Sequence, residues 1–208
     1  MNYPRAKRIA DLLIAGMAVI ALAPLLLAVA VALRITQGRP VFFRQPRVGR
    51  DGAPFLLLKF RTMMDGAPAP PDARPVRKDH ADPRITPLGR LLRRAALDEL
   101  PQLWNVLRGE MSLVGPRPLP VADLAHPAWL AIADAAERAR RADWARARQT
   151  VPPGLTGLWQ ISPEPETDFE NWLVRDRDYL RRRSLALDLY ILLVTPVAIL
   201  RGRRKSGG

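Results

Sequence analysis

The sequence contains no cysteine, so disulfide bonds and thiolate-ligated zinc sites are both excluded. Histidine is nearly absent as well: only His80 and His126 occur, and each stands in a polar, proline-adjacent stretch. We expect both to be surface residues rather than metal ligands. Cysteine and histidine together supply most zinc sites and many catalytic sites. Neither residue type identifies a site in this sequence.

Acidic residues are also scarce, with 20 Asp and Glu against 33 Lys and Arg, which gives a formal net charge of +13. Such an excess calls for an anionic partner: nucleic acid, an anionic membrane surface or a phosphorylated substrate. The 208 residues suffice for one catalytic domain plus a membrane element. The 21 prolines argue for long ordered connections rather than a compact helical bundle.

One long apolar run is present, the 22 uncharged residues Leu12–Leu33, about 33 Å as a straight helix. A single transmembrane span is one interpretation, but Pro24 lies mid-run and should bend the helix. Both flanks are basic, whereas the positive-inside rule lets a simple span satisfy only one of them. A re-entrant segment that enters and leaves by the same face satisfies both. The basic flanking residues are Arg5, Lys7, Arg8, Arg34, Arg39 and Arg44.

The chain is organised around the stretch Ile85–Pro118. Thr86-Pro87 predicts a helix start, because a hydroxyl caps the first turn and proline fits the first helical position. A second amphipathic segment runs to Gly109, a plausible C-cap. The spacing places Asp98 where the N-cap of this segment belongs.

Asp98 and Glu99 form an acidic pair with two interpretations. Asp98 can be a capping carboxylate alone. Alternatively, it is an ionised carboxylate at a helix N-terminus, a place that also favours phosphate. Such a carboxylate can attack a phosphoryl centre and form an acyl phosphate. Glu99 could then hold the Mg²⁺ that this chemistry requires.

Two further stretches carry candidate phosphate-binding groups. Residues 40–63 predict two short strands around the turn at residues 49–52, with Lys59 and Arg61 on one face of the second strand. Two cations on one face of a short strand are most often solvated. The rigid Pro116-Arg117-Pro118 segment is either a structural turn or a shelf for a base or phosphate.

Two C-terminal helices are also expected. The arginine-rich stretch 127–149 predicts a basic amphipathic helix, with Trp144 embedded in it. It either lies at the headgroups of an anionic membrane or presents a solvated face. The apolar stretch 185–200 is too short for a confident span, and we expect a surface-lying or core helix with a basic anchor.

Several blocks resemble the bacterial sugar transferases, the monotopic phosphoglycosyl transferases. LDELPQLWNVLRGEMSLVGPRP carries the resemblance most specifically, and the blocks follow the family's order over nearly the whole chain. The other blocks are KFRTM (59–63), DPRITPLGRLLR (82–93), PGLTG (153–157) and SLALDLYIL (184–192). The resemblance implies transfer of a phospho-sugar from a UDP-sugar to polyprenyl phosphate. The transfer would release UMP and proceed through an aspartyl-phosphosugar intermediate.

The resemblance also assigns roles. Asp98 and Glu99 would be catalytic, with Mg²⁺ bound mainly through Glu99. The substrate-binding residues expected are Lys59, Arg61, Arg93, Pro116, Arg117, Pro118 and Asp176. The chain departs from the family after Gln160, where Ser162-Pro163-Glu164 replaces the frequent Asn-Gly-Arg run. An arginine near the sugar is therefore missing or supplied from elsewhere.

The combined expectation is an α+β, mostly helical monotopic membrane protein with a re-entrant N-terminal helix–break–helix and a small β-hairpin. Residues 1–38 would form the membrane helix. Residues 39–208 would form a catalytic domain with interfacial amphipathic helices, on the cytoplasmic face of the bacterial inner membrane. Expected partners are a UDP-sugar, polyprenyl (undecaprenyl) phosphate and inner-leaflet anionic lipids, with no nucleic acid. Self-association into a homo-oligomer is left open.

Two alternatives compete with this reading. A membrane-tethered basic module that binds anionic lipid or nucleic acid would explain the charge, but not the Asp98–Glu99 pair and its flanking blocks. A metal-dependent phosphohydrolase would use the carboxylates as ligands only, and it would form no covalent intermediate.

The re-entrant interpretation predicts that the N-terminus and the Arg39 region lie on the same, cytoplasmic side of the membrane. Single cysteines at Asn2 and Gln37 should therefore both resist an impermeant thiol reagent applied from outside the cell. Labelling after permeabilisation is the control. Strong labelling of Asn2→Cys from outside would contradict the re-entrant interpretation and favour a single transmembrane span.

Overall fold

The computed structural model describes residues 3–64, 82–121, 134–162 and 169–205. His80, His126 and the start of the expected basic helix lie outside these residues. The described elements are α1 (Tyr3–Gln37), β1 (Phe42–Val48), η1 (Arg50–Gly52), β2 (Pro54–Phe60), α2 (Pro87–Arg94), η2 (Leu97–Gln102), α3 (Leu103–Arg108), β3 (Ser112–Val114), α6 (Ala135–Arg148), β4 (Gly154–Thr156), α7 (Leu158–Ile161), α8 (Phe169–Arg182) and α9 (Leu185–Lys205).

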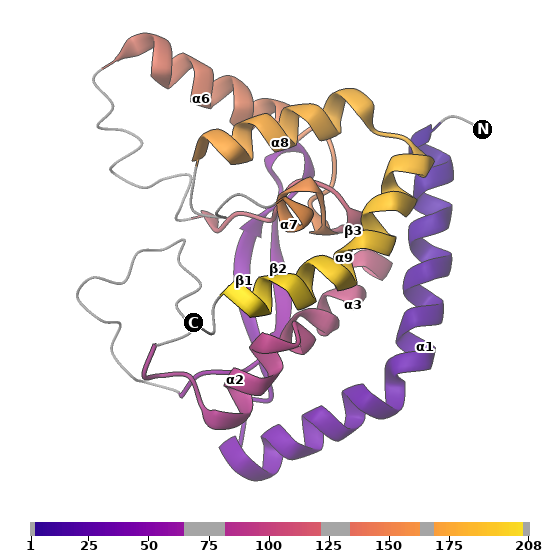
Figure 1. Cartoon of the computed structure of the whole chain (residues 1–208), viewed down its shortest axis with the longest axis vertical. Coiled ribbons are helices and arrows are strands. Elements are labelled where there is room, and N and C mark those ends of the chain that lie inside the picture. The colour runs from indigo at the N-terminus through magenta and orange to yellow at the C-terminus, as the bar shows by residue number, and fades with distance from the viewer. Residues whose placement is uncertain (1–2, 65–81, 122–133, 163–168, 206–208) are drawn as a thin grey trace.

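The chain is mostly helical around two small sheets, which confirms the α+β class (Figure 1). β1 and β2 form the expected antiparallel hairpin, with Val48 opposite Pro54 and Phe42 opposite Phe60. Its turn contains Asp51 in a left-handed conformation, φ 55°. The sequence did not predict the second sheet, in which β3 and β4 pair in parallel.

α1 is one bent helix with Pro24 inside it, and Figure 1 shows the bend partway along its length. Proline removes one backbone hydrogen bond and clashes with the preceding turn, so a bend is the expected result. The two halves pack on different parts of the protein. Ala15 lies in the main core with Leu57 and Val106, whereas Val29 and Leu33 join a separate cluster with Phe60 and Leu92.

Much of the apolar surface of α1 is not covered by protein. Met17, Ile20 and Ile35 are 63%, 77% and 78% exposed. Among the described residues, α1 is the one helix long and apolar enough to cross a membrane. α9 adds a second exposed apolar face beside its buried Ile191, formed by Leu185, Leu189, Leu193, Val197 and Leu200. Exposed apolar surface of this extent marks a contact with lipid or protein.

Polar contacts anchor the N-terminal part of α1 to the rest of the chain. The Arg8 guanidinium donates to the carbonyl groups of Val106 and Leu107 (2.6 and 2.8 Å), which end α3. Asp11 accepts from the Ser112 hydroxyl (2.7 Å) and from the backbone N–H of Leu113 (3.2 Å). These partners satisfy backbone groups that would otherwise be buried without hydrogen bonds.

A second group of contacts binds the same part of α1 to α8 and α9. Asp188 of α9 accepts from Lys7 (2.9 Å), Tyr3 (3.0 Å) and Tyr179 (3.0 Å). Burial is the main cause that raises the pKa of both tyrosines, so they remain neutral donors. The basic N-terminal flank is therefore partly structural, in addition to any contact with a membrane.

The central stretch begins as predicted and then differs. The Thr86 hydroxyl accepts from the Gly89 N–H (3.0 Å) and Pro87 opens α2. Gly109 ends α3 at φ 82°. Asp98, however, is not an N-cap, so that interpretation is wrong. Ala96 occupies the cap position of η2 at φ 53°, and Asp98 lies inside its first turn. Pro101, inside η2, lacks the N–H that a regular helix would use there.

Asn105, buried at 2% exposure, joins the hairpin to α3. Its side-chain amide donates to the Leu56 carbonyl (2.8 Å) and accepts from the Leu58 N–H (3.0 Å). It also donates to Glu110 (2.6 Å). The amide thus pairs with one carbonyl and one N–H on the inner edge of β2, as a neighbouring strand would.

The contact between α2 and the end of the hairpin predicts a stability effect. A Cβ on Gly89 would lie 2.1 Å from the Thr62 carbonyl oxygen, whereas a Cβ on Gly16 of α1 meets nothing within 4 Å. Gly89→Ala should therefore destabilise the protein by about 1–3 kcal/mol through overpacking. Gly16→Ala, the matched control, should be neutral or stabilising because alanine favours the helix. Thermal unfolding in detergent, followed by circular dichroism, measures both, and equal effects would contradict the packing argument.

Candidate active site

The acidic pair lies in η2, between two helices that meet at a sharp turn. Ala96 turns the chain from α2 into η2 in a left-handed conformation, which costs a non-glycine residue about 1–2 kcal/mol. Asp98 is 8% exposed. Strain of this kind next to a buried carboxylate is common where a site fixes its reacting groups.

Glu99 meets the cation that the sequence placed on the second strand. The Lys59 ammonium lies 2.8 Å from Oε1 of Glu99, and both side chains are largely shielded from solvent. β2 carries Lys59 to the acidic pair, and the Asn105 contact fixes β2 relative to the helix that follows this pair. The structure thus brings Lys59 and Glu99 together, two residues that lie 40 positions apart in the sequence.

Arg93 of α2 lies near the same carboxylates. Its Nε donates to the Thr62 hydroxyl (2.8 Å). Burial lowers the pKa of Arg93, while the charges of Asp98, Asp82 and Glu99 oppose that shift. A partly desolvated cation beside two carboxylates can hold a phosphate group close to them. Arg84 binds Asp82 (2.6 Å) and holds the pKa of that carboxyl at about 2.

Arg61, the other basic residue of the strand block, is directed elsewhere. Its guanidinium donates to the carbonyl groups of Gln37, Gly38 and Arg39, which follow α1. It is 7% exposed. Arg61 therefore contacts the backbone at the C-terminal end of α1. It is close to Lys59 in the sequence, but these hydrogen bonds are with carbonyl groups rather than with the acidic pair.

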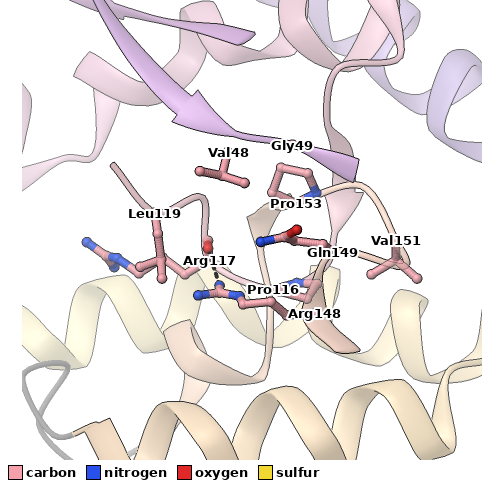
Figure 2. A pocket seen from close by; sticks show the side chains of 9 residues that line it. All are labelled: Val48, Gly49, Pro116, Arg117, Leu119, Arg148, Gln149, Val151 and Pro153. Atoms are coloured by element: carbon pink, nitrogen blue, oxygen red, sulfur yellow. Dashed lines mark hydrogen bonds between the residues drawn. The ribbon is translucent and has the colours of Figure 1, made fainter. Parts of the chain in front are cut away.

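Arg117 belongs to a second cluster. Its guanidinium lies over the Trp159 ring at 4.6 Å, and Pro116 and Arg117 line a small pocket with Val48, Gly49, Leu119, Arg148, Gln149, Val151 and Pro153 (Figure 2). The Pro118 carbonyl accepts from Arg47 (2.7 Å). The segment is well fixed, as two prolines suggested, and it is held by residues the sequence did not indicate.

Asp176 lies in this second cluster, on α8. It is 3% exposed, accepts from the Trp144 indole (3.0 Å) and pairs with Nε of Arg148 (3.3 Å). Burial raises the pKa of Asp176, and the Arg148 charge opposes that shift. The structure thus places Asp176 against α6, in the cluster that holds Arg117.

Sequence reasoning missed Arg148 and Asn105, and it misjudged Trp144. The basic stretch suggested a solvated or headgroup-facing helix, but Trp144 is 1% exposed and Arg148 is 6% exposed, both packed toward α8. Their spacing of four residues put them on one helix face, which was the available signal. For Asn105 no signal was available, because its partners are backbone groups of a distant strand.

Among the described residues, no three His, Cys, Asp or Glu side chains are arranged to hold a metal. A cage made wholly of protein ligands is therefore missing from this part of the chain. The acidic pair still suits Mg²⁺, which proteins often bind through one or two carboxylates together with substrate phosphates.

Comparison with known proteins identifies relatives over most of the chain. The chain is 39% identical to the exopolysaccharide production protein ExoY of Sinorhizobium fredii, over 93% of this chain and 85% of that relative. It is 41% identical to a UDP-glucose:undecaprenyl-phosphate glucose-1-phosphate transferase of Caulobacter vibrioides, over 93% of this chain and 69% of the relative.

A third relative is longer. The chain is 38% identical to a protein of the same name from Xanthomonas campestris, over 94% of this chain but 39% of that relative. The model of one family, bacterial sugar transferase, matches residues 2–202. With the acidic pair, the Lys59 contact and the Pro116–Pro118 segment in place, the chain belongs to the bacterial sugar transferase family.

Proposed function

We propose that this protein transfers a phospho-sugar from a UDP-sugar to polyprenyl phosphate, releases UMP and starts glycan assembly on a lipid carrier. The observation that carries the proposal is the Asp98–Glu99 pair, partly buried and bordered by Lys59 and Arg93. Relatives named as glucose-1-phosphate transferases and exopolysaccharide production proteins support it. The reaction is a phosphoryl transfer, in which positioning and charge stabilisation dominate catalysis.

Asp98 is the proposed nucleophile. Its carboxylate oxygen attacks the phosphorus that carries the sugar, the bond from that phosphorus to the bridging oxygen breaks, and UMP leaves with the bond's electron pair. An aspartyl-phosphosugar remains. A phosphate oxygen of the polyprenyl phosphate then attacks the same phosphorus and displaces the aspartate, which gives polyprenyl-diphosphate-sugar. Both steps exchange one phosphorus–oxygen bond for another.

Glu99 is the proposed Mg²⁺ ligand. The ion would offset negative charge on the diphosphate and on the leaving UMP. Lys59 holds the Glu99 side chain in place at 2.8 Å and adds a positive charge at the same point. Arg93 supplies a second cation for the donor diphosphate or for the incoming lipid phosphate. The adjacent positions of Asp98 and Glu99 let one turn present both nucleophile and metal ligand.

The exposed apolar faces of α1 and α9 support membrane association. A re-entrant α1, bent at Pro24, would keep both basic flanks on the cytoplasmic side of the inner membrane. The phosphate of the polyprenyl acceptor lies at that membrane surface. It would therefore reach the acidic pair without leaving the layer of lipid headgroups. Inner-leaflet anionic lipids would bind the excess positive charge.

UDP-glucose is the proposed donor, because several relatives are named for glucose transfer. Another is named as a galactosyl transferase, so UDP-galactose is the natural comparison. The replacement of the Asn-Gly-Arg run by Ser162-Pro163-Glu164 makes this comparison informative.

The first experiment measures UMP release with undecaprenyl phosphate, Mg²⁺ and a panel of UDP-sugars. We expect turnover with wild type and a loss of at least about 10³-fold for Asp98→Asn, since an amide is not a competent nucleophile. Asn has the shape of Asp, so the thermal unfolding midpoint should stay close to that of wild type. A purely binding module would release no UMP in this assay. A phosphohydrolase that frees sugar phosphate would release UMP with every turnover whether or not undecaprenyl phosphate is present.

Without lipid acceptor, the wild-type protein should release about one equivalent of UMP and gain the mass of one phospho-sugar. The adduct should map to Asp98 by mass spectrometry of the quenched protein. An adduct on Glu99, or none on an active enzyme, would remove Asp98 from the proposed role.

Glu99→Gln should also impair turnover, by about 100-fold, because it removes the carboxylate charge and thereby weakens Mg²⁺ binding. Raised Mg²⁺ should restore part of this loss, whereas it should not restore the Asp98→Asn variant. A titration of UMP release against Mg²⁺ for both variants provides the comparison. Equal responses of the two variants to Mg²⁺ would contradict the separate roles.

A further inference from the structure

The backbone of residues 115–119 is held at every carbonyl. These five groups accept hydrogen bonds, in chain order, from the Trp159 indole (3.1 Å), the Gly154 N–H (2.8 Å), Arg148, Arg47 (2.7 Å) and the Val48 N–H (3.1 Å). The donors come from β1, β4, α6 and α7. These contacts fix the position of the Arg117 main chain, and the five carbonyl groups are already occupied by protein donors.

Arg148 differs from the other four donors. Arg148 is 6% exposed, and its guanidinium is engaged by Asp176 on one side and by the Arg117 carbonyl on the other. Figure 2 shows its guanidinium pointing to the Arg117 carbonyl, with the Arg117 side chain pointing away from it. Arg148 thus contacts the main chain of Arg117, whose guanidinium lies over the Trp159 ring.

Asp176 and Trp144 fix the orientation of Arg148. The Arg148 Nε lies 3.3 Å from Asp176, and the guanidinium stacks over the Trp144 ring at 4.5 Å. Trp144 in turn donates to the same Asp176 oxygen at 3.0 Å. A planar guanidinium can bind a carboxylate on one edge and a carbonyl on another, whereas an ammonium is a point charge that cannot bridge both.

We propose that Arg148, oriented by Asp176, is a positioning residue that sets the location of the Arg117 guanidinium for substrate binding. The inference rests on the proposed function, and it takes Arg117 to bind the diphosphate of the UDP-sugar, the role that the family resemblance implies for this residue. It gives Asp176 an indirect role, through Arg148 and the Arg117 carbonyl, in place of direct contact with substrate.

The test compares Arg148→Lys, Arg117→Met and the double variant. Lysine keeps the positive charge beside Asp176 and loses the second contact. Arg148→Lys should raise the KM for the UDP-sugar and the Kd for UDP by about tenfold, the effect of one lost charged hydrogen bond. The kcat should change less than about threefold. In the Arg117→Met background, Arg148→Lys should add almost nothing to KM or Kd, because the side chain it positions is gone.

The matched control is Arg146→Lys on the same helix, where the exposed Arg146 pairs with the exposed Asp143. It should leave KM and Kd unchanged. Asp176→Asn keeps an acceptor for the Trp144 indole and should reproduce the Arg148→Lys pattern. It also provides the measurement if Arg148→Lys does not fold.

Three results would overturn the inference. The first is a normal KM and Kd with less active protein, which indicates a structural role alone. The second is independent, additive effects of the Arg117 and Arg148 changes. The third is a Kd for UDP that Arg117→Met does not alter. UDP binding is measured by calorimetry without any turnover, so wild type that binds UDP but releases no UMP would count against the proposed function and not against this inference.

Discussion

The hydrogen bonds between the Asn105 amide and the inner edge of β2 are the constraint on which the rest of the site depends. A two-stranded hairpin is marginal in water and leaves one edge of each strand unpaired. Here a buried side chain takes the place of a third strand, binding both Leu56 and Leu58. Because Lys59 follows Leu58 and α3 follows η2, this contact sets how Lys59 meets Glu99.

The membrane helix is tied into the same arrangement at both ends. Arg8 holds the carbonyl groups that end α3, and Arg61 holds those that follow α1. Between these points Pro24 allows a bend, so two short apolar faces pack on two different clusters while the remaining apolar surface stays exposed. The basic residues that suggested a membrane topology therefore also supply buried hydrogen bonds, and charge patterning alone does not separate the two roles.

The expected site residues fall into two clusters, and these clusters were not equally predictable. Short-range signals gave the Thr86 cap, the Gly109 end and the hairpin, because each depends on local backbone chemistry. The N-cap position predicted for Asp98 was wrong because Ala96 occupies it instead. Ala96 has a left-handed conformation, which local propensity does not anticipate for a residue with a Cβ. The contacts of Asp176 with Trp144 and Arg148 join α8 to α6. Trp144 and Asp176 are 32 residues apart in the sequence, so no local pattern could show this contact.

The sequence by itself identified the acidic pair and the apolar N-terminal segment with its proline. It also indicated the family of the protein and the α+β class. These depend on residue type, order and periodicity, which are read without coordinates. Only the tertiary structure decided which cations meet Glu99, that Arg61 turns to the backbone after α1, and that five carbonyl groups around Arg117 are held by four separate elements. Side-chain direction and long-range pairing follow from packing and from the need to satisfy buried polar groups, and both are settled only when the whole chain folds.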